Sequence, residues 1–394
     1  MSCRKSEKLL KIIFGSNAVI SAAVVLIGFI FATLLLIIIG RNPAGFFQSI
    51  LQVVSGFDSR RGTWNARYIG EWLVVSMPLI LCGMSMGFSA RAGLFNIGAE
   101  GQYIAGLTAA QIIAQTGFFP EFINAIPFLH LTAAVLGAMT AGALWGAVAG
   151  FLKARFNVSE VVATIMMNYI ALFLHRLISM RIPGSNTFRT PDFPSSAALS
   201  SPLLESLTNL SRLNNGLWLT IIALIAYSLI MEKSTLGFSL RAAGYNKDAA
   251  FYAGFRVKTN ITAAMTISGA FAGLAGAIVI LGMFTHGRVL TAFEGYGFDG
   301  IAVALAGSCS AAGMAVMGLF FGMLKSAEPL MQSRQIPGVI VTIVIALVVI
   351  FISLRPALQN FLLTRLTQSE TQLNDNISFF AKLKARFFYK KETL

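Results

Sequence analysis

The chain has 394 residues, of which 56% are hydrophobic and only 12% are charged, and its formal net charge is +14. Soluble domains contain roughly 25% charged residues, so this composition excludes an ordinary soluble globular protein and indicates a polytopic membrane protein. The positive charge does not indicate a nucleic-acid partner, because Lys and Arg are dispersed in short connectors between apolar runs. We interpret them as a membrane-orientation signal.

A transmembrane helix needs roughly 20 apolar residues, and the sequence predicts an all-α bundle of about ten such helices. In chain order the predicted spans cover residues 18–40, 71–89, 98–117, 131–152, 160–179, 217–231, 262–284, 298–309, 311–325 and 337–354. The eighth and ninth spans are short and nearly contiguous. Residues 298–325 therefore form two spans, a re-entrant hairpin or one broken helix.

Most Lys and Arg residues lie in connectors that are cytoplasmic if both termini are inside. The positive-inside rule therefore predicts a multi-pass protein with cytoplasmic N- and C-termini. In this arrangement residues 1–17 are a basic cytoplasmic N-terminus, residues 18–354 the transmembrane domain and residues 355–394 a basic cytoplasmic tail. Residues 180–216, rich in Ser, Pro and Asn, form an extracytoplasmic loop.

The stretch FNIGAEGQ, residues 95–102, departs from the apolar pattern at the start of the third span. At 100° per residue, Asn96 and Glu100 share one helical face, while small residues such as Gly101 lie on the opposite face. Small residues let a neighbouring helix approach closely, so we expect the polar face to line a cavity or a buried polar network. The alternative is that Glu100 lies at the cytoplasmic interface or pairs with Arg91.

A second glycine-rich polar stretch, HGRVLTAFEGYGFDG, covers residues 286–300 and contains Glu294 and Asp299. In the predicted topology it lies on the opposite side of the membrane from FNIGAEGQ. Two interrupted segments of opposite orientation resemble the inverted repeats that build transporter sites, although no residue-by-residue repeat is visible.

The third departure is LRAAGYNKDAAFYAGFRVKTN, residues 240–260, within the cytoplasmic segment 237–260. Asn246 is a suitable N-cap, Asp248 favours the first helical turn, and Gly254 can end the helix in a left-handed conformation. This pattern predicts a helix of about two turns. Its centre is apolar and aromatic, so we expect it to contact another protein surface, or else to pack under its own bundle.

The sequence resembles the membrane subunits of ABC importers in the branched-chain amino acid and simple-sugar permease superfamily, with the strongest likeness to nucleoside-type permeases. The resemblance covers roughly residues 70–354. It rests on GLFNIGAEGQ (93–102), SEVVATIMMNYIAL (159–172), RAAGYNKDAAFYAGF (241–255), ISGAFAGLAGA (267–277) and GYGFDGIAVALAG (295–307). The sequence departs from the expected pattern after residue 307, where SCSAAGM replaces a more polar, proline-containing turn.

The resemblance implies a bacterial inner-membrane permease with three partners: a second homologous permease, a cytoplasmic ATPase and an extracytoplasmic substrate-binding lipoprotein. It implies no cofactor, metal or catalytic residue in this chain, since ATP and Mg²⁺ bind the ATPase. The segment that couples to the ATPase would contain Gly244, Asn246, Ala249, Ala250, Tyr252 and Gly254.

The chain lacks the G-x-x-x-x-G-K-[ST] loop that binds phosphates, so we expect the energy to come from a partner or an ion gradient. The predicted function is the translocation path of an ATP-driven importer for a polar, uncharged solute such as a nucleoside. The candidate path residues are Asn96, Glu100, Gln102, Asn168, Tyr169, Glu294 and Asp299. For Asn168, a helix-to-helix hydrogen bond is an equally good account.

Other functions stay open at this level. A close relative with the same architecture could carry riboflavin or a simple sugar. An ion-coupled secondary transporter would use Glu100, Glu294 or Asp299 as its protonation site. The three histidines are scattered and no H-E-x-x-H motif occurs, which argues against a zinc protease. Uptake that stops when the proton gradient is removed, but continues when ATP is removed, would favour the ion-coupled class.

Overall fold

The structure is a computed structural model that describes residues 17–353, except residue 59 and residues 116–125. The predicted basic N-terminus and basic tail lie outside these described residues, apart from Asn17. The main elements are α2 (Asn17–Ile38), α3 (Pro43–Ser55), β1 (Phe57–Asp58), β2 (Thr63–Trp64), α4 (Arg67–Arg91), α5 (Ala99–Gln115), α7 (Pro127–Phe156), α8 (Glu160–Ser179), β3 (Arg189–Asp192), α9 (Pro202–Leu207), α10 (Gly216–Ser228), α11 (Thr235–Tyr245), α12 (Lys247–Tyr252), α13 (Val257–Gly282), β4 (His286–Arg288), α14 (Tyr296–Ala306), α15 (Ala311–Gln332) and α16 (Val339–Ser353).

These elements form two compact units. The larger unit, Leu36–Thr342, contains every helix from α3 to α15. The smaller unit contains the described residues 17–35 of α2 and 343–353 of α16, both of which are strongly apolar. All the predicted site residues lie in the larger unit, which is the subject of the following sections.

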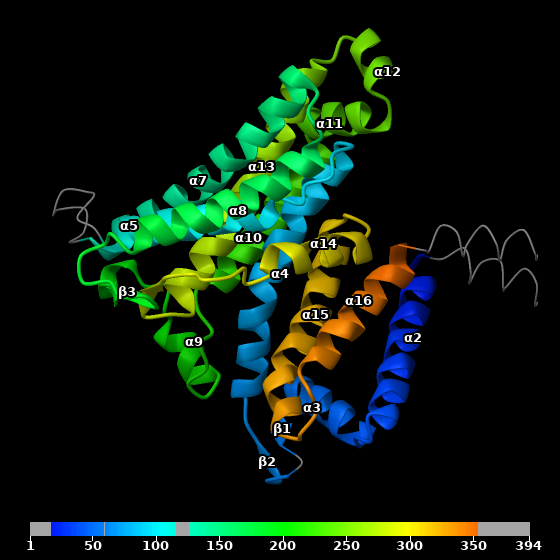
Figure 1. Cartoon of the computed structure of the whole chain (residues 1–394), viewed down its shortest axis with the longest axis vertical. Helices are drawn as coiled ribbons and strands as arrows, with labels where there is room; N and C mark the ends of the chain where they lie inside the picture. Colours follow the sequence, from blue (N-terminus) through cyan, green and yellow to red (C-terminus); the bar gives the residue numbers. More distant parts are fainter. Residues whose placement is uncertain (1–16, 59, 116–125, 354–394) are drawn as a thin grey trace, which may run out of the picture. The chain divides into compact units, whose positions relative to one another are not determined.

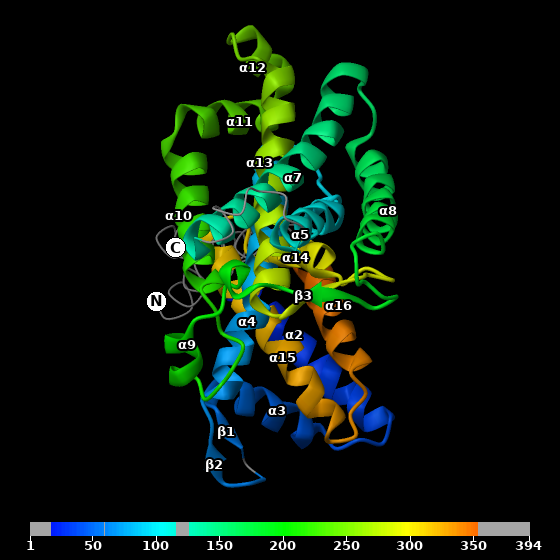
Figure 2. The ribbon, with the colours of Figure 1, turned by 90° about the vertical axis from the view of Figure 1, so that its left-hand side faces the viewer.

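Helices α4 and α13 form the centre of the larger unit (Figures 1 and 2). Helix α13 packs against α4, α5 and α7, and α4 also contacts α14 and α15. Within the most apolar 18-residue segment of α4 and of α13, 83% is buried inside the protein, whereas the corresponding share is 33% in α7 and in α8. Apolar helices can face either protein or lipid, so it is this difference in burial that identifies α4 and α13 as the core helices.

Close packing of α7 on α13 depends on glycine. A Cβ added at Gly142 would lie 2.3 Å from the carbonyl oxygen of Gly269, and one at Gly146 would lie 2.2 Å from that of Met265. Gly142 and Gly146 are four residues apart, so they lie on the same helical face. This small-xxx-small pattern lets two helix backbones touch, as is common between membrane helices.

Six helices in the described part of the chain are long and apolar enough to cross a membrane. They are Arg67–Arg91, Phe128–Phe156, Glu160–Ser179, Gly216–Lys233, Val257–Gly282 and Ala311–Gln332. The predicted count of about ten is therefore not confirmed. The predicted third span is the 17-residue α5, and the predicted eighth span is the 11-residue α14. An 11-residue helix rises only about 16 Å, which is too short to cross the hydrocarbon core.

Residues 298–325 form two separate helices, α14 and α15, joined by a four-residue turn. In this turn Ser308 and Cys309 adopt left-handed conformations, with φ of 53° and 51°. Ser310 caps α15 by accepting a hydrogen bond from the Gly313 amide (3.2 Å). The SCSAAGM sequence thus makes the turn without proline, by strained backbone and a serine cap.

The ends of the larger unit agree with the predicted loops. The loop predicted over residues 180–216 contains β3 and α9, and its Arg212 donates hydrogen bonds to Glu71 at the start of α4. Figure 1 shows α12 at the opposite end of this unit from the hairpin of β1 and β2. The assignment of these two ends to the two faces of the membrane stays a prediction.

Candidate functional site

The stretch before α5 is held in a buried hydrogen-bond network. The Asn96 side chain accepts from the Gly98 amide (2.9 Å) and donates to Gln102 Oε1 (2.9 Å) and to Ser268 Oγ (2.7 Å). Ser268 in turn bonds with Ser85 of α4. Asn96 is 0% and Gln102 1% exposed, so both polar groups are satisfied inside the protein. In this conformation the two candidate path residues join α4, α5 and α13.

Glu100 caps another helix. Its Oε1 accepts a hydrogen bond from the Gly295 amide (2.9 Å), and its Oε2 accepts one from the Gly297 amide (2.6 Å). These amides belong to the start of α14, where backbone N–H groups lack partners within the helix and the helix dipole favours an anion. A Cβ added at Gly297 would lie 2.2 Å from the Glu100 backbone nitrogen, so glycine is required there.

This contact joins two segments that the sequence singled out, and it rules out one alternative for Glu100. The two glycine-rich polar stretches, expected on opposite sides of the membrane, meet at Glu100 and residues 295–297. The alternative pairing of Glu100 with Arg91 is wrong, because Arg91 forms its ion pair with Glu232. The meeting of two helix starts inside the protein is the arrangement found where transporter helices are interrupted.

The small face predicted for α5 is confirmed, and α8 is the helix that packs on it. Asn168 of α8 accepts a hydrogen bond from the Gly101 amide (2.8 Å) and donates one to the Ile97 carbonyl (3.1 Å). A Cβ added at Gly101 would lie 2.8 Å from the Asn168 Oδ1. Because Asn168 is 1% exposed, the helix-to-helix hydrogen bond explains this amide.

A second charged cluster surrounds Glu294. One carboxylate oxygen pairs with Arg288, and the other accepts a hydrogen bond from the buried Tyr103 hydroxyl of α5. The Arg288 guanidinium also lies over the Phe284 ring, 4.5 Å from its centroid. The two opposite charges offset each other, so the cluster carries no net charge.

Asp299, one turn into α14, pairs with Lys325 of α15. The Lys325 ammonium also lies 5.5 Å from the centre of the Tyr296 ring. Both charged side chains are about one-quarter exposed, at 24% and 23%, so solvent reaches the pair. Asp299 is therefore compensated within the chain and is not an isolated carboxylate.

These two ion pairs border a cavity of about 690 Å³. Its wall combines three aromatic residues, two basic residues, an acidic residue and several small ones: Val75, Phe188, Arg288, Val289, Leu290, Thr291, Ala292, Phe293, Glu294, Tyr296 and Lys325. Tyr169, 49% exposed on α8, packs edge-on against Phe293 with ring centroids 5.1 Å apart. Aromatic faces beside compensated charges suit a flat, polar and uncharged solute.

Buried side chains hold the cavity wall in position. Gln111 of α5 accepts a hydrogen bond from the Arg288 amide (2.9 Å), and His175 of α8 accepts one from the Leu290 amide (3.2 Å). The other ring nitrogen of His175 bonds with Thr108 (2.8 Å). His175 is therefore a buried packing residue that supports the cavity wall.

The sequence interpretation missed Arg288 as the partner of Glu294 and missed Lys325 altogether. For Lys325 a signal was present, because a lysine inside the apolar helix α15 demands a partner. For Gln111 and His175 no local signal exists, since their partners are backbone amides more than 100 residues away.

The predicted coupling helix is confirmed as a structural element. Helix α12 covers Lys247–Tyr252, and the Asn246 side chain accepts hydrogen bonds from the amides of Asp248 and Ala249, both at 3.0 Å. Gly254 follows the helix with φ of 87°, the left-handed conformation expected of it. Local capping by these residues explains why so short a helix is well defined.

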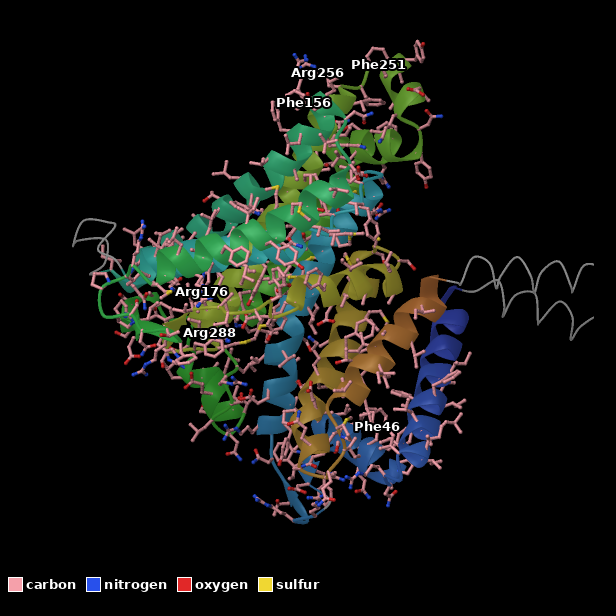
Figure 3. All side chains as sticks on the ribbon, in the orientation of Figure 1. Phe46, Phe156, Arg176, Phe251, Arg256 and Arg288 are labelled. Carbon is pink, nitrogen blue, oxygen red and sulfur yellow. The ribbon has the colours of Figure 1, made fainter. Side chains whose placement is uncertain are left out.

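Most of α12 faces outward. Ala250 is 4% exposed, whereas Phe251 is 67% and Tyr252 88% exposed, and Ala249 also lies on the surface. Figure 3 shows Phe251 and Arg256 at the α12 end of the larger unit. A groove of about 510 Å³ at this end is lined by Lys247, Asp248, Phe251, Gly254, Phe255, Arg256, Val257 and Lys258. The exposed aromatic rings do not support the alternative that α12 packs under its own bundle.

Comparison with known proteins assigns the fold to a family. The model of the branched-chain amino acid transport system / permease component family matches residues 68–352. The chain belongs to this permease family. The match includes the buried network, Glu100, the cavity wall and α12, so the whole candidate site lies in the permease domain. The permease is thus a multi-pass membrane transport subunit.

The permease is also similar to individual transport proteins. It is 42% identical over 314 residues to the guanosine ABC transporter permease protein NupP of Bacillus subtilis, a match that covers 77% of this chain and 88% of the relative. It is 35% identical to the nucleoside ABC transporter permease protein NupB of Lactococcus lactis, over 84% and 89% of the two chains. It is 34% identical to the glucose ABC transporter permease protein TsgB13 of Haloferax volcanii, over 72% and 75%. No solved structure gives a significant match.

Proposed function

We propose that this permease forms part of the membrane path of an ATP-driven importer for nucleosides. The observation that carries the proposal is α12, a capped helix that presents Phe251 and Tyr252 to the surroundings. Exposed aromatic groups on a rigid helix are suited to a protein groove. The partner is a cytoplasmic ATPase that binds ATP and Mg²⁺, and its closure on ATP would move α12.

Other partners follow from the same family. A second homologous permease would complete the path, and an extracytoplasmic binding lipoprotein would deliver the solute. The protein would lie in the bacterial inner membrane with both termini in the cytoplasm. The coupling segment would comprise Gly244, Asn246, Ala249, Ala250, Tyr252 and Gly254, which include the cap, the buried contact and the exposed ring of α12.

Two observations favour nucleosides over sugars as the solute. The relatives at 42% and 35% identity are named as guanosine and nucleoside permeases. In the cavity, Phe293 offers a ring on which a base could stack, while Glu294 and Arg288 offer hydrogen bonds to a ribose. The two compensated ion pairs add no net charge, which suits an uncharged solute.

An ion-coupled mechanism is less well supported. The three possible protonation sites of such a mechanism all have partners within the chain. Glu100 accepts hydrogen bonds from two backbone amides. Glu294 pairs with Arg288 and accepts a hydrogen bond from Tyr103, and Asp299 pairs with Lys325. Proton coupling would require a proton to displace at least one of these partners in each transport cycle. Energy from a separate ATPase requires no such proton.

Replacing Phe293 tests the solute assignment. Stacking of a base on an aromatic ring contributes roughly 1–3 kcal/mol, so Phe293→Ala should lower uptake of labelled guanosine at sub-saturating concentration by about tenfold. Phe173→Ala is the control, because that ring is 64% exposed on the same helix as Tyr169 but lies outside the cavity wall. Cells carrying the complete importer should prefer guanosine over riboflavin and glucose in competition. Preference for glucose, or normal guanosine uptake by Phe293→Ala, would reject the assignment.

A further inference from the structure

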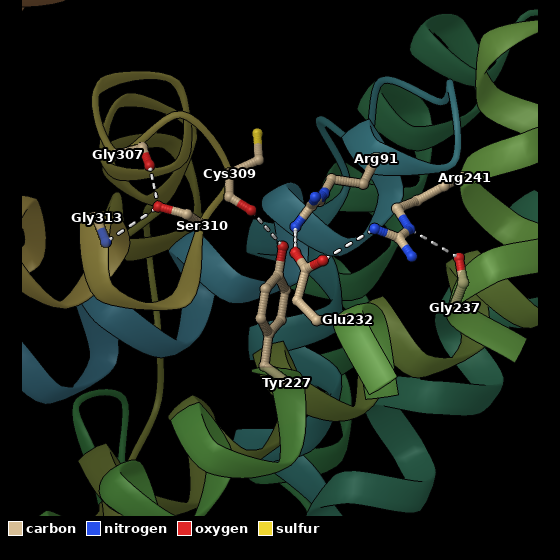
Figure 4. Close-up of polar contacts among 9 residues, drawn as sticks. All are labelled: Arg91, Tyr227, Glu232, Gly237, Arg241, Gly307, Cys309, Ser310 and Gly313. Atoms are coloured by element: carbon tan, nitrogen blue, oxygen red, sulfur yellow. Dashed lines mark hydrogen bonds and ion pairs between the residues drawn. The ribbon is translucent and has the colours of Figure 1, made fainter. Parts of the chain in front are cut away.

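Glu232 joins three helices at the α12 end of the larger unit. It lies in one turn of π-helix, Leu229–Lys233, which continues α10. One of its carboxylate oxygens pairs with Arg91 at the end of α4, and the other accepts a hydrogen bond from Arg241 of α11 (2.9 Å). Figure 4 shows the Glu232 carboxylate between the two guanidinium groups. Single π-turns of this kind are frequent at functional sites.

A backbone contact lies beside this ion-pair cluster. A Cβ added at Gly244, near the end of α11, would lie 2.6 Å from the Arg91 carbonyl oxygen. A Cβ added at Gly93, which has φ of +73°, would lie 2.9 Å from the Gly244 Cα. The end of α11 thus rests directly on the end of α4, and the two glycines make that approach possible.

The same helix that carries Glu232 also reaches the turn between α14 and α15. The hydroxyl of Tyr227, 1% exposed, donates a hydrogen bond to the Cys309 carbonyl (2.7 Å) (Figure 4). Cys309 and Ser308 hold left-handed backbone conformations in this turn. Strained backbone persists only where surrounding contacts determine it, and the Tyr227 hydrogen bond is one such contact.

These contacts link the coupling segment to the centre of the permease by two routes. The first route begins at Gly244 of α11, which contacts Gly93 just after α4. Three residues after Gly93 the chain reaches the buried Asn96. The second runs through Tyr227 to the turn that ends α14. Both routes reach Glu100, which follows Asn96 in the chain and caps the start of α14.

We propose that Glu232, with Arg91 and Arg241, is a positioning group that makes α11, α12 and the end of α4 move as one body. Movement imposed on α12 is thereby delivered to the segment before α5 and to α14. The proposal rests on the function proposed above, in which an ATPase moves α12. The three side chains are between 25% and 40% exposed, so the ion pairs contribute little to folding stability. Their loss should therefore uncouple the helices without unfolding them.

Transport efficiency tests this proposal. The permease, its partner permease, ATPase and binding protein are reconstituted in vesicles, and nucleoside imported per ATP hydrolysed is measured. Glu232→Gln should lower this ratio by roughly fivefold, the usual scale for residues along a coupling network, while ATP hydrolysis continues. Glu71→Gln is the matched control, because Glu71 pairs with Arg212 at the opposite end of α4. The ratio of nucleoside imported to ATP hydrolysed in Glu71→Gln should stay within twofold of the wild-type ratio. An unchanged ratio in Glu232→Gln would overturn the proposal.

A double-mutant cycle separates a joint role from a merely structural one. If Glu232 and Arg241 act as a unit, Arg241→Gln added to Glu232→Gln should cause no further loss of transport per ATP. Additive losses from the two substitutions would contradict a shared role.

A distance measurement decides the proposal without relying on transport. Spin labels are attached at Tyr245→Cys, at the 92% exposed end of α11, and at Phe95→Cys after α4, in a chain whose native cysteines are replaced. The wild-type pair should give a narrow distance distribution that ATP leaves unchanged, and Glu232→Gln should broaden it. A broad wild-type distribution would reject the positioning role. Failure of ATP-driven uptake by the wild-type assembly would instead reject the proposed function.

Discussion

The Glu100 carboxylate lies between the starts of two helices, since its own helix α5 begins at Ala99 and it caps α14 at Gly295 and Gly297. It is 0% exposed, so no water replaces these hydrogen bonds if they are lost. Hydrogen bonds to a charged group contribute more than neutral ones. Glu100 is therefore a fixed point on which the relative position of α5 and α14 depends.

Replacing Glu100 by glutamine removes the negative charge and keeps nearly the same side-chain shape. One side-chain oxygen becomes an amide donor that faces a backbone N–H, so one hydrogen bond is lost and another is weakened. We expect Glu100→Gln to lower the free energy of unfolding by roughly 2–3 kcal/mol and to impair uptake. Thermal unfolding of the purified protein measures the first effect, with Glu205→Gln on α9 as the control. Equal melting temperatures and equal uptake would contradict this role.

At this scale the sequence predicted which residues matter better than it predicted their partners. Glu100 and Asn168 attract attention because polar groups within apolar runs must be satisfied. Their partners are main-chain groups of Gly295, Gly297, Gly101 and Ile97, and backbone amides leave no mark in a sequence. An interpretation based on side chains therefore placed Glu100 in a cavity or a buried polar network, with Arg91 as the alternative partner, and did not identify the two glycine amides.

At the scale of elements, the contact between α7 and α13 is made by glycine backbones and has no room for side chains. Gly146→Leu should therefore destabilise the protein by roughly 3 kcal/mol, since a side chain there must displace the Met265 carbonyl. Val148→Leu, at a position 49% exposed on the same helix, should be tolerated. Thermal stability and the yield of monodisperse protein in detergent measure both effects. A Gly146→Leu protein as stable as Val148→Leu would show that the two helices pack less closely.

Helix α12 and the membrane helices differ in how far their bounds could be predicted. The bounds of α12 follow from a local cap at Asn246 and a left-handed Gly254, so the sequence placed them correctly. The apolar runs indicate membrane helices but not their lengths, because α14 ends inside an apolar run at Gly307. The strained turn that follows is held by a hydrogen bond from Tyr227 of α10, a residue that lies far away in the sequence.

At the scale of the whole molecule, the permease family and the helical architecture could be predicted from the sequence, whereas the arrangement of the cavity could not. The cavity needs β3 and β4 to pair, which brings Arg189 beside Arg288. It also needs α15 to place Lys325 beside Asp299. These are contacts between distant segments, and their residue types alone do not specify them.

The central claim is that a separate ATPase drives the permease through α12, and ATP-dependent uptake tests it most directly. Vesicles containing the full assembly are loaded with ATP and Mg²⁺, or given a proton gradient without ATP, and entry of labelled nucleoside is measured. Phe251→Asp, at a position 67% exposed, should keep the fold but lose ATPase binding and uptake. The control is Leu203→Asp, 69% exposed on α9, which should keep both. We predict that uptake requires ATP and does not depend on the proton gradient. Gradient-driven uptake by the permease alone, or normal ATP-driven uptake by Phe251→Asp, would contradict the claim.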